Sequence, residues 1–231
     1  MNNIVTSPLF GLVLCLGTFQ IGGWIQKKIK SPVANPLLIA IILIITTLKI
    51  TGIPLAAFNA GGNIISVFLA PATALLALSV YRQLSLLKKY LLPIILGCFA
   101  GVLTSFFSAY VLCRLLKLSD VLILSLLPKS VTTPIAMEIS QQLGGIVPVT
   151  VTAVVITGIM GAILSPCLIK LFHVRNPVAM GVGIGACSHA IGTSKAVEMG
   201  EIEGAMSGIS LCVSGILMVL LSQIWYNNII L

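Results

Sequence analysis

Long apolar stretches follow one another along most of this chain, separated by short polar segments. A helix needs roughly 20 residues to cross a hydrocarbon layer about 30 Å thick, and in lipid every backbone N–H and C=O must find a partner within the protein. A transmembrane β-barrel requires short alternating segments instead. The pattern predicts an all-α integral membrane protein with six full spans, at about 7–25, 33–50, 60–81, 90–113, 147–169 and 205–227.

Two further segments, 118–146 and 174–204, do not fit this pattern. They are too rich in Gly, Pro, Ser and Thr for ordinary spans and too apolar for water-exposed loops. We expect each to be a re-entrant or broken helix. The expected organisation is a single membrane domain over 1–231, with N-terminal spans in 1–116 and the broken segments with two spans in 117–231.

Composition and charge place the chain in a membrane. Charged residues make up 8% of it, against about 25% in soluble domains. The 13 Lys and Arg exceed the 5 Asp and Glu, for a net charge of +8, but they lie in short clusters between apolar runs, which excludes a nucleic-acid surface. Positive loops mark the cytoplasmic side. The clusters are Lys27, Lys28 and Lys30; Arg82, Lys88 and Lys89; and Lys170 and Arg175. They predict a multi-pass protein of the inner-membrane type with both termini outside and no cleaved signal peptide.

The two polar segments contain a short internal repeat. The stretch at 133–139 reads TPIAMEI, and the stretch at 193–199 reads TSKAVEM. Each is followed by glycines and an apolar span, and the charge pattern makes the two enter from opposite sides. Inverted repeats with broken helices form the mid-membrane binding sites of secondary transporters. Chance similarity between apolar sequences is the alternative.

The first segment combines two prolines, three hydroxyls and a lysine. Pro128 and Pro134 each remove an N–H and disfavour helix at the preceding residue, which predicts a break over 127–133. Thr133 is the expected cap of the next half-helix, whose positive end favours an anion. Ser130 and Thr132 would add hydrogen bonds and Lys129 a charge. The alternative for Lys129 is an external loop from which it reaches water.

The second segment carries Ser188, His189, Gly192 and Thr193. Four glycines lie just before and within this stretch, and they permit close packing and strained turns. His189 is a candidate for proton coupling; the alternative is a neutral histidine bonded to a backbone carbonyl. Lys195 and Glu198 have the spacing of a helical ion pair.

Other residues add less. Asn35 and Thr73, beside Pro36 and Pro71, could line a cavity, or could mark only a helix start and a kink. The six cysteines form no C-x-x-C pair and are interpreted as small buried hydrophobes. No metal-ligand spacing, paired nucleophile or phosphate-binding loop is present, so we expect no enzyme activity, no metal and no cofactor.

The two signature stretches resemble those of the LrgB/CidB family. The match rests on LLPKSVTTPIAM at 126–137 and SHAIGTSKA at 188–196, with NPL at 35–37 and PAT at 71–73 as secondary positions. The resemblance implies two roles. Bacterial members are called antiholin-like and are thought to modulate murein hydrolase activity with a small LrgA/CidA partner, whereas plastid members look like glycolate/glycerate carriers and some bacterial systems are linked to pyruvate.

Two hypotheses follow. In the first, the protein sits in the lipid bilayer as an elevator-like carrier of small monocarboxylates. The carboxylate then binds between the second segment on one side and the first segment on the other, at Lys129, Ser130, Thr132 and Thr133. In the second, it modulates autolysis through an LrgA/CidA-type partner or as a homodimer, with the spacing of Gly97 and Gly101 making the oligomer contacts.

Overall fold

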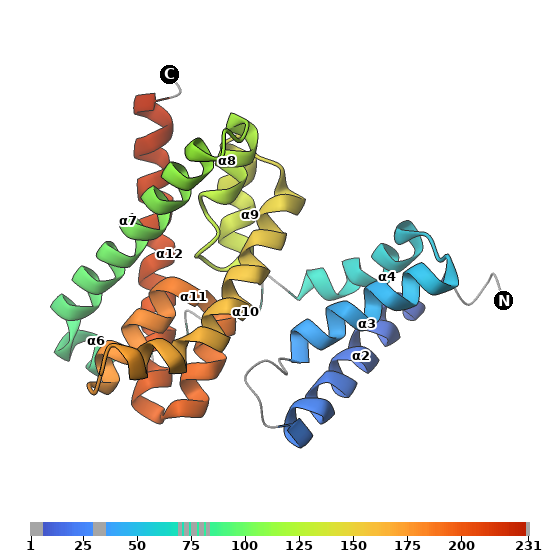
Figure 1. Cartoon of the computed structure of the whole chain (residues 1–231), viewed down its shortest axis with the longest axis horizontal. Helices are drawn as coiled ribbons and strands as arrows, with labels where there is room; N and C mark the ends of the chain where they lie inside the picture. Colours follow the sequence, from blue (N-terminus) through green and yellow to red (C-terminus); the bar gives the residue numbers. More distant parts are fainter. Residues whose placement is uncertain are drawn as a thin grey trace. The chain divides into compact units, whose positions relative to one another are not determined.

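The computed structural model describes residues 7–29, 36–68, 71, 74, 78, 81 and 84–229 (Figure 1). Throughout this part of the chain the regular elements are α-helices, which confirms the all-α prediction. The chain divides into two compact units, Met1–Ala74 and Leu75–Leu231. Each unit has its own packing.

In the described part of the first unit, three helices have defined bounds: α2 (Pro8–Ile29), α3 (Pro36–Thr51) and α4 (Leu55–Val67). A Cβ on Gly11 would lie 3.0 Å from the Cα of Gly61, so α2 and α4 touch through their backbones. A Cβ on Gly22 would lie 3.0 Å from the Cα of Pro36 at the start of α3. Without a hydrophobic effect between helices in lipid, such close packing at small residues is what holds membrane helices together.

The predicted third span, 60–81, has the wrong bounds. Helix α4 begins at Leu55, directly after Pro54 in an extended conformation, and ends at Val67 with Phe68 as its cap. The helical residue Pro71 follows shortly afterwards. A proline inside a helix removes a hydrogen bond and clashes with the preceding turn, which accounts for an interruption just ahead of it. The sequence places an interruption near Pro71, but not the early end at Val67.

The second unit carries both polar segments. Its described helices from residue 84 onward are α6 (Leu84–Lys89), α7 (Leu91–Leu115), α8 (Asp120–Leu126), α9 (Thr133–Gln142), α10 (Val147–Leu171), α11 (Pro177–Met199) and α12 (Glu201–Ile229). Helix α11 packs along α12 and is flanked by α7 and α10, while α9 packs on α10. Figure 1 shows α8 and α9 at the upper end of this unit and α11 towards the lower end, with α10 running down and α12 running up.

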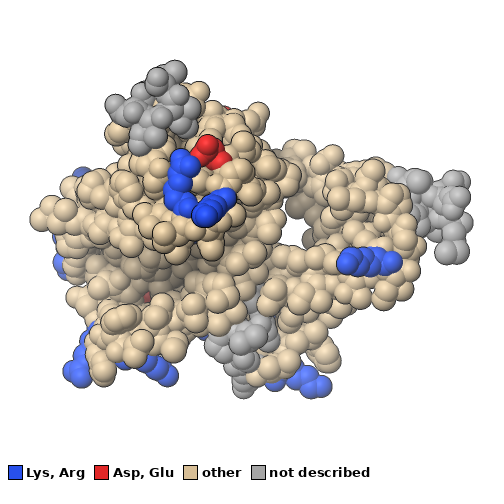
Figure 2. Space-filling model, turned by 45° about the horizontal axis from the view of Figure 1, so that its top comes forward, with Lys and Arg blue, Asp and Glu red and all other residues tan. Residues whose placement is uncertain are grey.

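Four of the described helices, α2, α7, α10 and α12, are long and apolar enough to cross a membrane. Helices α3 and α4 are apolar but have only 16 and 13 residues, so six full spans are not confirmed. The outer face of α7 exposes Leu92, Leu96 and Phe99. On the face drawn in Figure 2, charged side chains form a few separate groups on an otherwise uncharged surface. These features fit a multi-pass membrane protein.

The spacing of Gly97 and Gly101 is used inside the second unit. A Cβ on Gly97 would lie 2.7 Å from a methyl group of Val182, and one on Gly101 would lie 3.1 Å from the Cβ of Ala186. The two glycines therefore let α7 approach α11 within the unit, whereas their assignment to oligomer contacts stays a prediction. Helix α7, grouped by the sequence with the N-terminal spans, packs against α11 and α12.

Candidate functional site

The first polar segment is broken where the prolines predict. Helix α8 ends at Leu126 and α9 begins at Thr133. Inside the break the main chain makes two long turn bonds, from Lys129 N to Leu126 O and from Val131 N to Pro128 O, both 3.3 Å. Leu127 and Val131 are fully enclosed by the unit. The break is thus an internal feature of the protein and not an exposed surface linker.

The cap of α9 lies one residue earlier than predicted. Thr132, with φ −62° and ψ 147°, is the N-cap, and Thr133 is the first helical residue. Pro134 can follow directly, because its missing N–H is one of those that have no partner in the first turn of a helix. Thr133 is half-buried and belongs to the helix instead of ending the break.

Two hydroxyls of the break are buried without a partner. Ser130 is 1% exposed and Thr132 is 5% exposed, and neither oxygen has a hydrogen bond. The Thr132 side chain does not cap α9, although N-cap threonines normally do so. An unsatisfied buried hydroxyl costs about 1–3 kcal/mol, and the N-terminus of a helix carries partial positive charge. This end of α9 can therefore donate hydrogen bonds to an anion and stabilise its negative charge.

Lys129 extends from the break towards α7 and α11. Its Nζ donates a hydrogen bond to Ser105 Oγ on α7 at 3.2 Å, and it lies within electrostatic range of Cys187 on α11. The side chain is half-buried. The ion pairs of the described residues, Arg114–Asp120 and Lys195–Glu198, do not involve it. The Lys129 ammonium is thus held inside the unit, and no carboxylate among the described residues forms an ion pair with it.

The second polar segment is broken at His189. Helix α11 has a kink there, with φ 42° and ψ −143°, a conformation that costs a non-glycine residue about 1–3 kcal/mol. The sequence assigned strained turns to the glycines, whereas the strain falls on a histidine. Gly158 and Gly161 of α10 leave the space that the side chains of His189 and Ser188 occupy. Packing against α10 therefore fixes the position of the kink.

The His189 ring and Thr193 stabilise this kink. The His189 Nε2 lies 2.9 Å from the carbonyl oxygen of Val154, which is the structural alternative considered for this residue; proton coupling stays a prediction. The Thr193 hydroxyl donates to the carbonyl oxygen of His189 at 2.9 Å and lies 2.8 Å from Ser207 Oγ of α12. Gly192 leaves room for the Ser188 side chain. The Thr193 hydroxyl therefore has a structural role.

Helix α7 lies beside both segments: Lys129 of the first break bonds to its Ser105, and Gly101, one turn earlier, lies against Ala186 of α11, shortly before Ser188 and His189. Ser188 and His189 are 3% and 2% exposed, so they are not in a surface linker. The predicted pairing of Lys195 with Glu198 is confirmed at 2.8 Å. Asn35 and Thr73 lie outside the described residues.

Sequence reasoning missed Ser105 and Cys187. Ser105 follows Gly97 and Gly101 at four-residue intervals, which is a signal that all three share one face of α7. Cys187 was grouped with the other cysteines as a buried hydrophobe, but Cys187 and Cys167 are exposed, while Cys98 and Cys113 are buried. That part of the cysteine interpretation is wrong.

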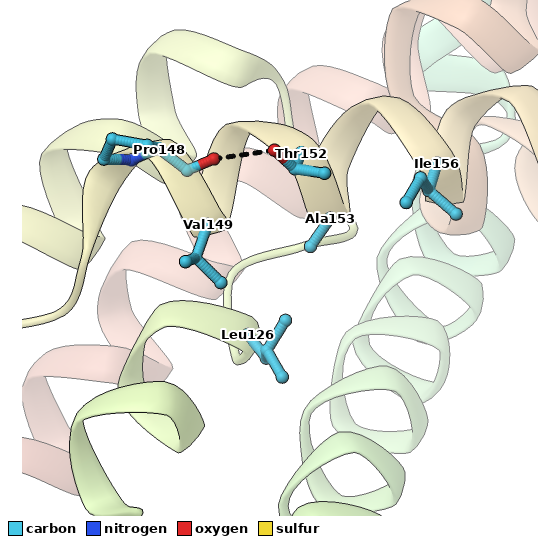
Figure 3. Close-up of a pocket in the computed structure, with 6 residues that line it drawn as sticks. All are labelled: Leu126, Pro148, Val149, Thr152, Ala153 and Ile156. Carbon is cyan, nitrogen blue, oxygen red and sulfur yellow. Dashed lines mark hydrogen bonds between the residues drawn. The ribbon is translucent and has the colours of Figure 1, made fainter.

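An apolar groove of about 360 Å³ lies between the end of α8 and the start of α10 (Figure 3). Its lining residues are Leu126, Pro148, Val149, Thr152, Ala153 and Ile156. The hydroxyl of Thr152 donates to the carbonyl oxygen of Pro148 at 2.8 Å, so it is not available to a ligand. None of the predicted site residues lines this groove, and it offers no charge for an anion.

Comparisons with known proteins agree over almost the whole chain. A model of the LrgB-like family matches residues 15–227. An "Antiholin-like protein LrgB" of Bacillus subtilis (strain 168) is 38% identical over 224 residues, which is 96% of this chain and 97% of the relative. Proteins of the same name from Bacillus mycoides (strain KBAB4) and Bacillus cereus (strain B4264) are 35% identical over 214 residues, covering 92% of this chain and 93% of each relative. No solved structure matches.

Proposed function

This chain belongs to the LrgB-like family, and we propose that it is a secondary carrier that moves small monocarboxylates across the bacterial plasma membrane. The proposed substrates are anions of the size of glycolate, glycerate, lactate and pyruvate. The observation that carries the proposal is that polar groups of the first break lack partners within the protein. Lys129 has no carboxylate among the described residues, and the buried hydroxyls of Ser130 and Thr132 have no hydrogen bond.

The energetic argument concerns these three groups together. A lysine at the middle of a membrane costs about 2.5–3.5 kcal/mol on insertion scales, and each unsatisfied buried hydroxyl costs about 1–3 kcal/mol. One carboxylate can accept hydrogen bonds from an ammonium and from two hydroxyls simultaneously, since it offers about four lone-pair sites. A small organic anion therefore offsets all three costs, whereas an uncharged solute would leave the Lys129 charge uncompensated.

Alternating access fits an inverted repeat of the two broken segments. In both, a half-helix follows the break, a short connection that contains Gly144 or Gly200 follows the half-helix, and a long helix comes next. Within the second unit, α10 and α12 run in opposite directions from the two segments (Figure 1), as two oppositely oriented copies would. This arrangement supports entry of the two segments from opposite sides of the membrane.

Uptake of labelled glycolate, lactate and pyruvate into proteoliposomes tests the carrier. We expect wild type to transport at least one of them and Lys129→Met to lose most of the uptake. Lys170→Met, which removes an exposed lysine at the end of α10, serves as the matched control. If wild type and Lys129→Met transport alike, the site is wrong; if wild type takes up none of the three, the substrate class is wrong.

The names of the relatives favour a second function. Proteins 35–38% identical to this chain are called antiholin-like, and such a protein would modulate murein hydrolase activity and autolysis together with a small LrgA/CidA-type partner, alone or as a homodimer. Under this proposal, polar substitutions at Ser130 and Ser188 are tolerated. Complementation of a deletion strain distinguishes the two: a lysis phenotype restored by Lys129→Met supports the partner-mediated role and not the carrier.

A further inference from the structure

We propose that α7 forms a wall of the anion site, where Ser105 positions the ammonium of Lys129 and the thiol of Cys187 lies beside the bound anion. The inference rests on the proposed function only in taking the ligand to be a small carboxylate. It adds two residues that come from helices outside the first break. It also predicts that one of them reports ligand binding directly, whether or not the ligand is transported.

The case for Ser105 begins with its place on α7. It lies one helical turn after Gly101, and Gly101 is where α7 touches Ala186 of α11. Ser105 is half-buried, and its Oγ accepts the hydrogen bond from Lys129 Nζ at 3.2 Å. The contact crosses from the break to a helix that the sequence placed elsewhere in the protein.

A contact of this kind matters because lysine is a flexible residue. Its side chain carries about 2 kcal/mol of rotamer entropy, and in a membrane it can extend along apolar surface until its ammonium reaches water. The bond to Ser105 keeps the ammonium beside α7 and α11 before a ligand arrives. Such preorganisation lowers the free-energy cost of binding, so Ser105 acts through Lys129 and is a positioning residue.

The case for Cys187 is its exposure next to buried neighbours. Ala186 and Ser188 on either side of it are buried, whereas Cys187 is exposed. It lies within electrostatic range of Lys129 and of Cys98 on α7. Because Ala186 lies against Gly101 of α7, one helical turn before Ser105, Cys187 follows directly after the residue that packs on the helix holding the Lys129 ammonium. A carboxylate bound to Lys129 would restrict access to this thiol.

Site-resolved alkylation tests the arrangement in the wild-type protein. Full-length protein in nanodiscs is treated with N-ethylmaleimide, and modification of Cys187 and of Cys167, an exposed cysteine on α10, is followed by mass spectrometry. Sodium pyruvate, lactate and glycolate are compared with sodium chloride at equal ionic strength. We expect at least one carboxylate to slow alkylation of Cys187 by about threefold or more, to leave Cys167 unchanged, and to lose this effect in Lys129→Met.

The outcomes separate the inference from the proposed function. An unchanged rate at Cys187 with all three carboxylates overturns the inference, while uptake of any of them in proteoliposomes would leave the carrier standing. Protection of Cys187 without uptake by the wild-type protein has the opposite meaning: the site binds carboxylate as inferred, and the transport proposal fails.

Variants of Ser105 test the positioning role. Because hydrogen bonds to charged groups are worth more than neutral ones, Ser105→Ala should raise the carboxylate concentration that half-protects Cys187 about tenfold. Ser105→Thr, which keeps a hydroxyl, should restore it to within about twofold. The matched control is Ser108→Ala, on an exposed residue of the same helix. Equal half-protecting concentrations for Ser105→Ala and wild type overturn the role, and an equal loss in Ser105→Thr marks a structural effect instead.

Discussion

The Nε2 of His189 lies 2.9 Å from the main-chain carbonyl oxygen of Val154, so the residue that breaks α11 also ties that break to α10. A carbonyl oxygen only accepts hydrogen bonds, and the ring must therefore donate from Nε2. The bond compensates for a backbone conformation that only glycine adopts freely. Ring and backbone of His189 thus have opposite effects on stability.

Substitutions of His189 should separate these effects. His189→Ala loses the hydrogen bond and keeps the strained backbone, which should lower the free energy of unfolding by about 1–3 kcal/mol. His189→Gly also loses the bond but removes the backbone strain, so its Tm in detergent should be higher than that of His189→Ala. A lower Tm for the glycine variant would show that the kink is not strained.

Gly158 of α10 should not tolerate a side chain. A Cβ there would lie 2.5 Å from Cε1 and 2.7 Å from Nε2 of the His189 ring, and the ring cannot move without losing its bond to Val154. We expect Gly158→Ala to lower the Tm, measured by thermal unfolding in detergent. The matched control is Gly183→Ala on α11, where a Cβ would meet nothing within 4 Å and a helix gains about 0.5–1 kcal/mol from alanine.

A bulky residue at Gly101 should separate α7 from α11. Gly101→Leu would push a side chain against Ala186, which lies 3.1 Å from the position of the new Cβ, and overpacking of this kind typically costs about 1–3 kcal/mol. The expected result is a lower Tm with an unchanged oligomeric state in size-exclusion chromatography. Loss of an oligomer at unchanged Tm would show instead that Gly101 makes an intermolecular contact.

Ser125 should be important for the turn between α9 and α10. Its buried Oγ accepts a hydrogen bond from Ile146 N at 2.7 Å and donates one to Val121 O at 2.6 Å. Ser125→Ala leaves the Ile146 N–H without this acceptor, at a cost of about 1–3 kcal/mol. Faster hydrogen exchange at Ile146 is the expected measurement, with the exposed Ser108→Ala as the comparison. Unchanged exchange would mean that water replaces the serine.

Local signals in the sequence were sufficient for the first break. Pro128 and Pro134 act on their own neighbours through steric exclusion and a missing N–H, so they predict the break before any tertiary contact is known. The same local reasoning put the cap at Thr133 instead of Thr132, since the final choice of a cap depends on where the half-helix packs. In the second segment, the four glycines permitted many break points, and the sequence contained no means of choosing among them.

The sequence by itself determined that this chain belongs in lipid, that it is helical and that 118–146 and 174–204 depart from regular spans, because apolar length and proline chemistry are properties of neighbouring residues. The tertiary structure alone decided that α11 breaks at His189, that Gly97 and Gly101 let α7 approach α11, and that Lys129 meets Ser105. These relationships join residues far apart in the chain. They depend on which helices carry residues small enough for the helices to touch.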